Sequence, residues 1–102
     1  MEKLILLAKG QMKRFPEGAE PFQMATRVLE ECGEVASEVN HFEGSGVKRL
    51  KHGEPSREAL AGEIRQAMAA LMQLAVYYGA EEELERSIDD SLRRMREEHL
   101  IG

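Results

Sequence analysis

The sequence has few aromatic residues and a deficit of positive charge. It contains no tryptophan, two tyrosines and three phenylalanines, and its 14 lysines and arginines face 19 aspartates and glutamates, a formal net charge of −5. A protein that binds nucleic acid needs cations to neutralise phosphates and rings on which unpaired bases stack. We therefore expect no nucleic-acid polymer among its partners.

Cysteine and long apolar runs are also scarce. The single cysteine, Cys32, cannot form an internal disulfide, and its position on an apolar helical stripe predicts a small core residue. The longest apolar run, residues 67–78, contains Gln73 and is too short to span a membrane. The apolar run at the N-terminus ends at Gly10, before the length of a signal peptide. These features predict a cytoplasmic protein with no membrane partner.

The apolar residues recur with the helical period, and no strand-like alternation is present. The 102 residues, 42% hydrophobic and 32% charged, fit one domain spanning residues 1–102. The predicted helices cover residues 2–14, 21 to 42 or 43, 57–78 with Ser56 as N-cap and Gly79 as stop, and a last segment that opens with three glutamates at 81–83. Four helices with short connections predict an all-α, antiparallel four-helix bundle.

The third predicted helix is apolar over more than half of its circumference. Helices of this kind are buried. In a chain this short, a second copy is needed to cover part of such a helix, so we expect a homodimer or homotetramer.

The second predicted helix carries an apolar stripe beside an acidic flank. The stripe contains Val28, Cys32, Val35 and Val39, which recur at intervals of three and four residues. The flank contains Glu31, Glu34 and Glu38, with Glu30 a little further round. Because like charges at these spacings destabilise a bare helix, the flank either lies in solvent or serves a cation.

The third predicted helix brings further oxygen atoms to the same border of the core. Glu63 and Gln66 are three residues apart and flank its apolar sector. Hard divalent cations such as Mg²⁺ bind carboxylate oxygens, retain waters and accept substrate phosphates to complete their shell. Acids on facing helices therefore favour a metal site.

At these residues the chain resembles the MazG-like, all-α nucleoside triphosphate pyrophosphohydrolases. The family pattern is E-E-x-x-E followed later by E-x-x-D. The first half stands here as Glu30-Glu31-Cys32-Gly33-Glu34 and the second as Glu63-Ile64-Arg65-Gln66. The run from Gln66 to Ala75 is also similar to the family's D-V-L-x-x-L-x-x-L-A run, and the likeness covers residues 22–79.

The resemblance implies an enzyme that splits a nucleoside triphosphate between its α and β phosphates, giving a monophosphate and pyrophosphate. The implied cofactor is Mg²⁺, with Mn²⁺ as the alternative ion. The implied metal ligands are Glu31, Glu34, Glu63 and, more weakly, Gln66. The implied catalytic residues are Glu34 and Glu30, the latter as general base for water.

Two observations keep other functions open. Gln66 stands where the family has aspartate and offers a carbonyl oxygen without a charge, which favours a catalytically silent helical dimer that binds a nucleotide or a protein. Glu38 and His41 form an E-x-x-H pair of the type found in di-iron bundles, but such a site needs a second pair and the sequence has none.

Two basic clusters are candidates for substrate phosphates. Lys48 and Arg49 lie in the glycine-rich segment between the second and third helices, and Arg93 and Arg94 lie near the end of the last helix. The alternative for Lys48 and Arg49 is a solvated loop. The alternative for Arg93 and Arg94 is a favourable interaction with the negative end of the helix dipole.

Overall fold

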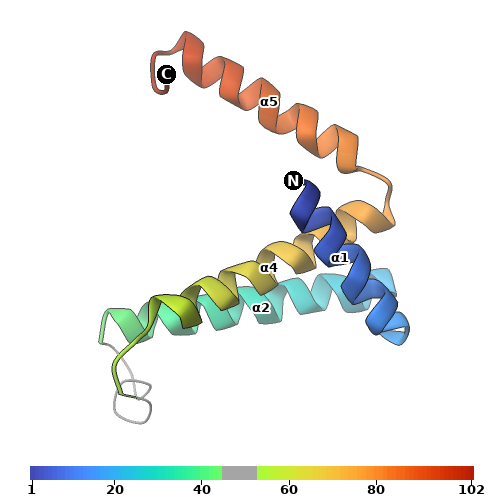
Figure 1. Ribbon diagram of the computed structural model, residues 1–102, viewed down its shortest axis with the longest axis vertical. Coiled ribbons are helices and arrows are strands. Elements are labelled where there is room, and N and C mark those ends of the chain that lie inside the picture. The colour runs from blue at the N-terminus through green and yellow to red at the C-terminus, as the bar shows by residue number, and fades with distance from the viewer. Residues whose placement is uncertain (45–52) are drawn as a thin grey trace.

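The computed structural model describes residues 1–44 and 53–102, and all regular structure in those residues is helical (Figure 1). The elements are α1 (Glu2–Arg14), a 3₁₀ turn η1 (Pro16–Gly18), α2 (Pro21–Phe42), α4 (Arg57–Tyr77) and α5 (Glu81–Glu97). The prediction of an all-α chain with four helices is confirmed for this part of the sequence, and the boundaries that were predicted agree to within one residue; no end was predicted for the last helix.

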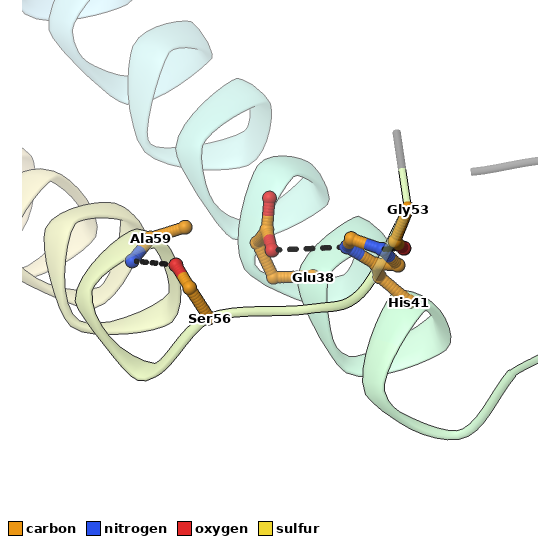
Figure 2. Close-up of polar contacts among 5 residues, drawn as sticks. All are labelled: Glu38, His41, Gly53, Ser56 and Ala59. Atoms are coloured by element: carbon orange, nitrogen blue, oxygen red, sulfur yellow. Dashed lines mark hydrogen bonds and ion pairs between the residues drawn. The ribbon is translucent and has the colours of Figure 1, made fainter. Parts of the chain in front are cut away.

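Local chemistry explains where these helices begin and end. Pro21 occupies the first turn of α2, where its missing N–H leaves no hydrogen bond unmade. The Ser56 Oγ accepts a hydrogen bond from the Ala59 N–H at 3.0 Å and caps α4 (Figure 2). Gly79, at φ 65°, adopts the left-handed conformation that lets the chain leave α4 and enter α5.

Three of the helices pack together and one diverges. Helices α2 and α4 lie side by side, and α1 crosses α4 (Figure 1). The buried apolar side chains of the described residues are Ala8, Met24, Ala69, Ala70 and Met72. Helix α5 leaves the end of α4 and extends away from α2 (Figure 1). Within a single chain, the fourth helix therefore does not close the predicted bundle.

The buried side of α2 differs from the predicted one. Met24, Glu38 and His41 are buried, whereas Cys32 is exposed and Val39 is 47% exposed. The prediction that Cys32 is a core residue is therefore wrong for the single chain.

The buried side of α2 lies between the apolar stripe and the acidic flank, because Val28, Val35 and Glu31 are half-buried whereas Glu30 and Glu34 are exposed. Buried His41 has polar groups of the chain beside both ring nitrogens, which lowers the cost of its burial.

The helices also show whether the described residues contain a candidate membrane span. None of the helices in residues 1–44 and 53–102 combines the length and the apolar character needed to cross a lipid bilayer.

Candidate functional site

Two acidic side chains from the predicted motifs approach each other where α2 and α4 pack. Glu31 on α2 and Glu63 on α4 are both half-buried. Burial raises the pKa of the Glu31 carboxyl, and the charges of Glu63, Glu34 and Glu30 raise it further, while Arg27 opposes them. Because charge interactions weaken with distance, the influence of Glu63 is consistent with the packing of α2 against α4, which brings the two motifs into the same part of the helix pair.

The other predicted ligands lie at the margin of this pair. Glu30, Glu34 and Gln66 are exposed. In residues 1–44 and 53–102, no three histidine, cysteine, aspartate or glutamate side chains converge closely enough to hold a metal ion. The protein alone thus offers two facing carboxylates with further oxygen atoms nearby, rather than a closed cage.

A cavity of about 860 Å³ opens beside Glu31. It lies between the end of α1, η1, α2 and α4, and its walls include both Glu31 and Gln66. This volume is within the range of small-molecule sites, about 300–1,000 Å³. The two motifs that the sequence singled out therefore border a space large enough for a nucleotide.

Three arginines line the same cavity. They are Arg14 from the last turn of α1, Arg27 from α2 and Arg65 from α4. Guanidinium groups bind phosphate oxygens through pairs of parallel hydrogen bonds. Sequence reasoning missed all three. Only the crossing of α1 over α4 brings Arg14 to this place. Arg27, one turn before Glu31, and Arg65, inside the second motif, could have been found from their spacing.

A chain of hydrogen bonds fixes Arg27. Its Nη1 donates to the Gln73 Oε1 at 3.2 Å, and its Nη2 donates to the Gly18 carbonyl oxygen at 3.3 Å. The Gln73 Nε2 in turn donates to the Gln11 Oε1 at 2.8 Å. A Cβ at Gly18 would collide with the Arg27 guanidinium. The guanidinium is therefore held in position before any ligand arrives.

Gln73 is a second residue that sequence reasoning did not recognise as functional. It is only 4% exposed, and both ends of its amide are hydrogen-bonded to cavity residues. The sequence did contain an indication of this role, because a glutamine that interrupts an apolar run must find hydrogen-bond partners when it is buried.

Glu38 and His41 form a separate buried pair near the end of α2. The His41 Nδ1 lies 3.8 Å from the Glu38 Oε2, and its Nε2 lies 2.6 Å from the Gly53 carbonyl oxygen (Figure 2). A carbonyl only accepts, so Nε2 carries a proton and donates it. The pair thereby links α2 to the segment that leads into α4, and both ring nitrogens of His41 face groups of the chain.

Of the predicted phosphate-binding residues, Arg93 and Arg94 are not brought to the site within one chain. Lys48 and Arg49 lie outside the described residues. Arg93 pairs with Asp90 at 3.4 Å, and the Arg94 Nη2 donates to the Ser91 Oγ at 3.3 Å. Both arginines are on α5, which diverges from α2 (Figure 1).

Comparisons with protein-family models, with curated proteins and with solved structures find no match to this chain. The description of this protein therefore rests on its own structure. In residues 1–44 and 53–102 it is a helical chain with a cavity lined by Glu31 and three arginines, and the charge of Glu63 acts on Glu31.

Proposed function

We propose that this chain is a MazG-like nucleoside triphosphate pyrophosphohydrolase that depends on a divalent metal. The observation that carries the proposal is the crowding of Glu31 by Glu63, Glu34 and Glu30 at the wall of an arginine-lined cavity. A site with acids on one side and fixed guanidinium groups on the other suits a ligand that arrives with both a metal ion and phosphates.

Glu31 and Glu63 are the residues that would hold Mg²⁺, with Glu34 and the carbonyl oxygen of Gln66 as further ligands. Burial raises the pKa of Glu31, and the charges of Glu63, Glu34 and Glu30 raise it further; a cation bound to the carboxylate would offset both effects. Proteins usually bind Mg²⁺ through one or two carboxylates and leave the remaining positions to water and substrate phosphates. The carboxylates of Glu31 and Glu63 are therefore enough to hold the ion when water and substrate phosphates fill its other positions.

Mg²⁺, when bound, supplies neutralisation of the phosphate oxygens and orientation of the attacking water. The chain's own arginines hold the triphosphate, with Arg27 already fixed by Gln73 and Gly18. Glu30, exposed next to Glu31, takes a proton from the water as its oxygen bonds to phosphorus. The α–β anhydride bond breaks, and the products are a nucleoside monophosphate and pyrophosphate.

A second function, metal-dependent nucleotide binding without turnover, has its own support. Gln66 provides no charge where the resembling family has aspartate, and the described residues contain no group of three convergent ligands. A site of lower charge retains a nucleotide in the cavity but stabilises the transition state less.

The test is pyrophosphate release from ribo- and deoxyribonucleoside triphosphates with Mg²⁺ or Mn²⁺. We expect release that stops when the metal is chelated and that is lost in Glu31→Gln and Glu63→Gln. Glu97→Gln, an equal charge change at the far end of α5, is the matched control and should keep wild-type activity. Metal-dependent binding by calorimetry without pyrophosphate would support the silent binder, and release of orthophosphate alone would mean that a different bond is cut.

The role of Gln66 is tested in the same system. Gln66→Asp adds one negative charge to the proposed metal shell and should tighten Mg²⁺ binding by about tenfold. Equal affinities in calorimetric titrations of the two proteins would place Gln66 outside that shell.

A further inference from the structure

The hydrogen bonds along one wall of the cavity have a fixed direction. A guanidinium group has no acceptor, so Arg27 can only donate, and the atom of Gln73 that it meets must be the carbonyl oxygen Oε1. The Gln73 Nε2 is then the atom that faces Gln11. Because an amide nitrogen also only donates, Gln11 must offer its own oxygen to Gln73. Arg27 thereby sets the orientation of both carboxamides.

This chain of hydrogen bonds ends on a donor at the cavity wall. Gln11 is half-buried and lines the cavity. Its Oε1 is engaged by Gln73, and no group in residues 1–44 and 53–102 accepts a hydrogen bond from its Nε2. The amide cannot turn over, because its nitrogen would then meet the nitrogen of Gln73 and leave two donors without an acceptor. Gln11 therefore offers a donor, and not an acceptor, to a ligand.

An aromatic ring lies one helical turn from this donor. Phe15 donates its backbone N–H to the Gln11 carbonyl oxygen at 3.0 Å, and its side chain lines the same cavity and is 59% exposed. Proteins that bind nucleobases stack them on exposed rings and recognise their edges with neutral hydrogen-bonding groups. Gln11 and Phe15 supply both, whereas Arg27 and Glu31 give other parts of the wall a charge.

The order of the groups places Gln11 and Phe15 away from the proposed metal site. Gln11 is joined to Arg27 only through Gln73, and Arg27 precedes Glu31 by one turn of α2. A nucleotide whose phosphates are held by Arg27 and by a metal ion at Glu31 has its base at the other end of the molecule. That end falls toward Gln11 and Phe15.

We infer that Gln11 is a specificity-determining residue, which donates a hydrogen bond to a carbonyl oxygen of the base and selects keto bases over amino bases. The inference rests on the proposed function, since it takes the cavity to hold a nucleotide. Uracil and hypoxanthine carry an oxygen where cytosine and adenine carry an amino group, which would set donor against donor. Gln73 acts through Gln11 and is a positioning residue.

Calorimetric titration with α,β-methylene nucleoside triphosphates and Mg²⁺ at pH 8 tests this, because these analogues cannot be hydrolysed between the α and β phosphates. Uridine is compared with cytidine, and inosine with adenosine. The two members of each pair have the same phosphates, sugar and ring size. We expect the keto member to bind about tenfold more tightly than its amino partner.

Two variants alter the donor. Gln11→Leu removes it and should bring the ratio of affinities within each pair to about one. Gln73→Glu places an ionised carboxylate beside Arg27 that accepts from both neighbours, so the Gln11 amide turns its oxygen to the ligand and the ratio should invert. Gln23→Leu, at an exposed position of α2 outside this cavity, is the matched control and should keep the wild-type ratio. A ratio within a pair is unaffected by a loss of affinity that both members share.

Three results would overturn the inference. They are equal affinities within both pairs for the wild type, a keto preference that survives in Gln11→Leu, and analogues that do not bind. Its failure is distinguishable from failure of the proposed function. A keto preference in binding without pyrophosphate release supports this inference alone, whereas release from natural triphosphates with equal affinities within both pairs supports the hydrolase alone. If a variant loses its helical circular dichroism, the ratios of the wild type still decide.

Discussion

Glu31 is the side chain whose ionised form is unfavourable for folding, although the proposed metal site needs it ionised. Its ionised form is disfavoured by burial and by three neighbouring acids, so its pKa in the folded protein is raised above the unfolded value. An acid placed in this way destabilises the folded state at every pH at which it is ionised. Such an unfavourable charge is expected where a ligand later compensates for it.

The first prediction is that Glu31→Gln stabilises the metal-free protein at pH 7. The folded state takes up the proton first as the pH falls, so the penalty is complete above the raised pKa and disappears below the unfolded value of about 4.5. Discounted for solvent screening, the gain is a few tenths of a kcal/mol, or about 1–4 °C in Tm. Thermal scans from pH 7 to pH 4 should show the two melting curves converging.

Addition of Mg²⁺ separates this effect from ordinary charge removal. It should raise the Tm of the wild type by linkage but leave Glu31→Gln unchanged. Glu97→Gln is the control, and a stabilisation of equal size in that variant would mean that net charge, not the Glu31 site, is responsible.

The second prediction concerns the buried amide of Gln73. Gln73→Leu keeps the side-chain size but removes both of its hydrogen bonds, to Arg27 and to Gln11. We expect a loss of about 1–2 kcal/mol in the free energy of unfolding, because its former partners are left part-buried and less well paired. Urea denaturation gives the measurement. Gln23→Leu, at an exposed position of α2, should change stability by less than about 0.5 kcal/mol.

At the scale of the helices, the residues that start or stop a helix act on the helix end next to them. Ser56 caps α4 through its own side chain, and Gly79 ends the same helix through its own backbone. The third prediction is therefore that Ser56→Ala costs about 1 kcal/mol of stability. The comparison is Ser87→Ala, within exposed α5, which should be neutral or slightly stabilising. A similar loss in both variants would show that the cap contributes nothing specific.

The helix boundaries could be predicted from the sequence because such signals lie within a few residues of each end. The side of α2 that is buried could not. The stripe with Cys32 and the flank with Glu31 both have the helical period, and the sequence pattern favoured the more apolar one. The buried side includes Glu38 and His41, whose contacts are with each other and with the Gly53 carbonyl oxygen beyond the helix, and no spacing in the sequence shows that second contact.

The candidate site, like the fold, could be predicted only in part from the sequence. The carboxylates Glu31 and Glu63 are found in motifs, and the spacing within each motif is local. Arg27 lies one helical turn before Glu31 on α2, and this local spacing places both on one side of the helix. The guanidinium group of Arg14 reaches the cavity only because α1 crosses α4. No period or spacing in the sequence carries that information.

At the scale of the whole molecule, the shape of one chain has a thermodynamic consequence. A chain that buried its exposed apolar side chains in an assembly would gain stability by association, and its unfolding equilibrium would contain a concentration term. The fourth prediction is that Tm rises with protein concentration in the wild type and in Ser87→Asp but not in Ile88→Asp, because Ile88 is an exposed apolar residue of α5 and Ser87 an exposed polar one. Differential scanning calorimetry over a hundredfold range of concentration is the measurement, and a Tm that stays constant in the wild type would contradict it.

The hydrogen bonds from Gln11 through Gln73 to Arg27 join three helices whose buried contacts are otherwise apolar, through alanine and methionine side chains. A ligand that engages the Arg27 guanidinium also restrains Gln73, and through it the last turns of α1. Local opening of α1 should then become rarer, although α1 contributes no proposed metal ligand. Amide hydrogen exchange would report this as slower deuterium uptake in α1 when the cavity is filled, so the first helix of the chain would act as a reporter of occupancy.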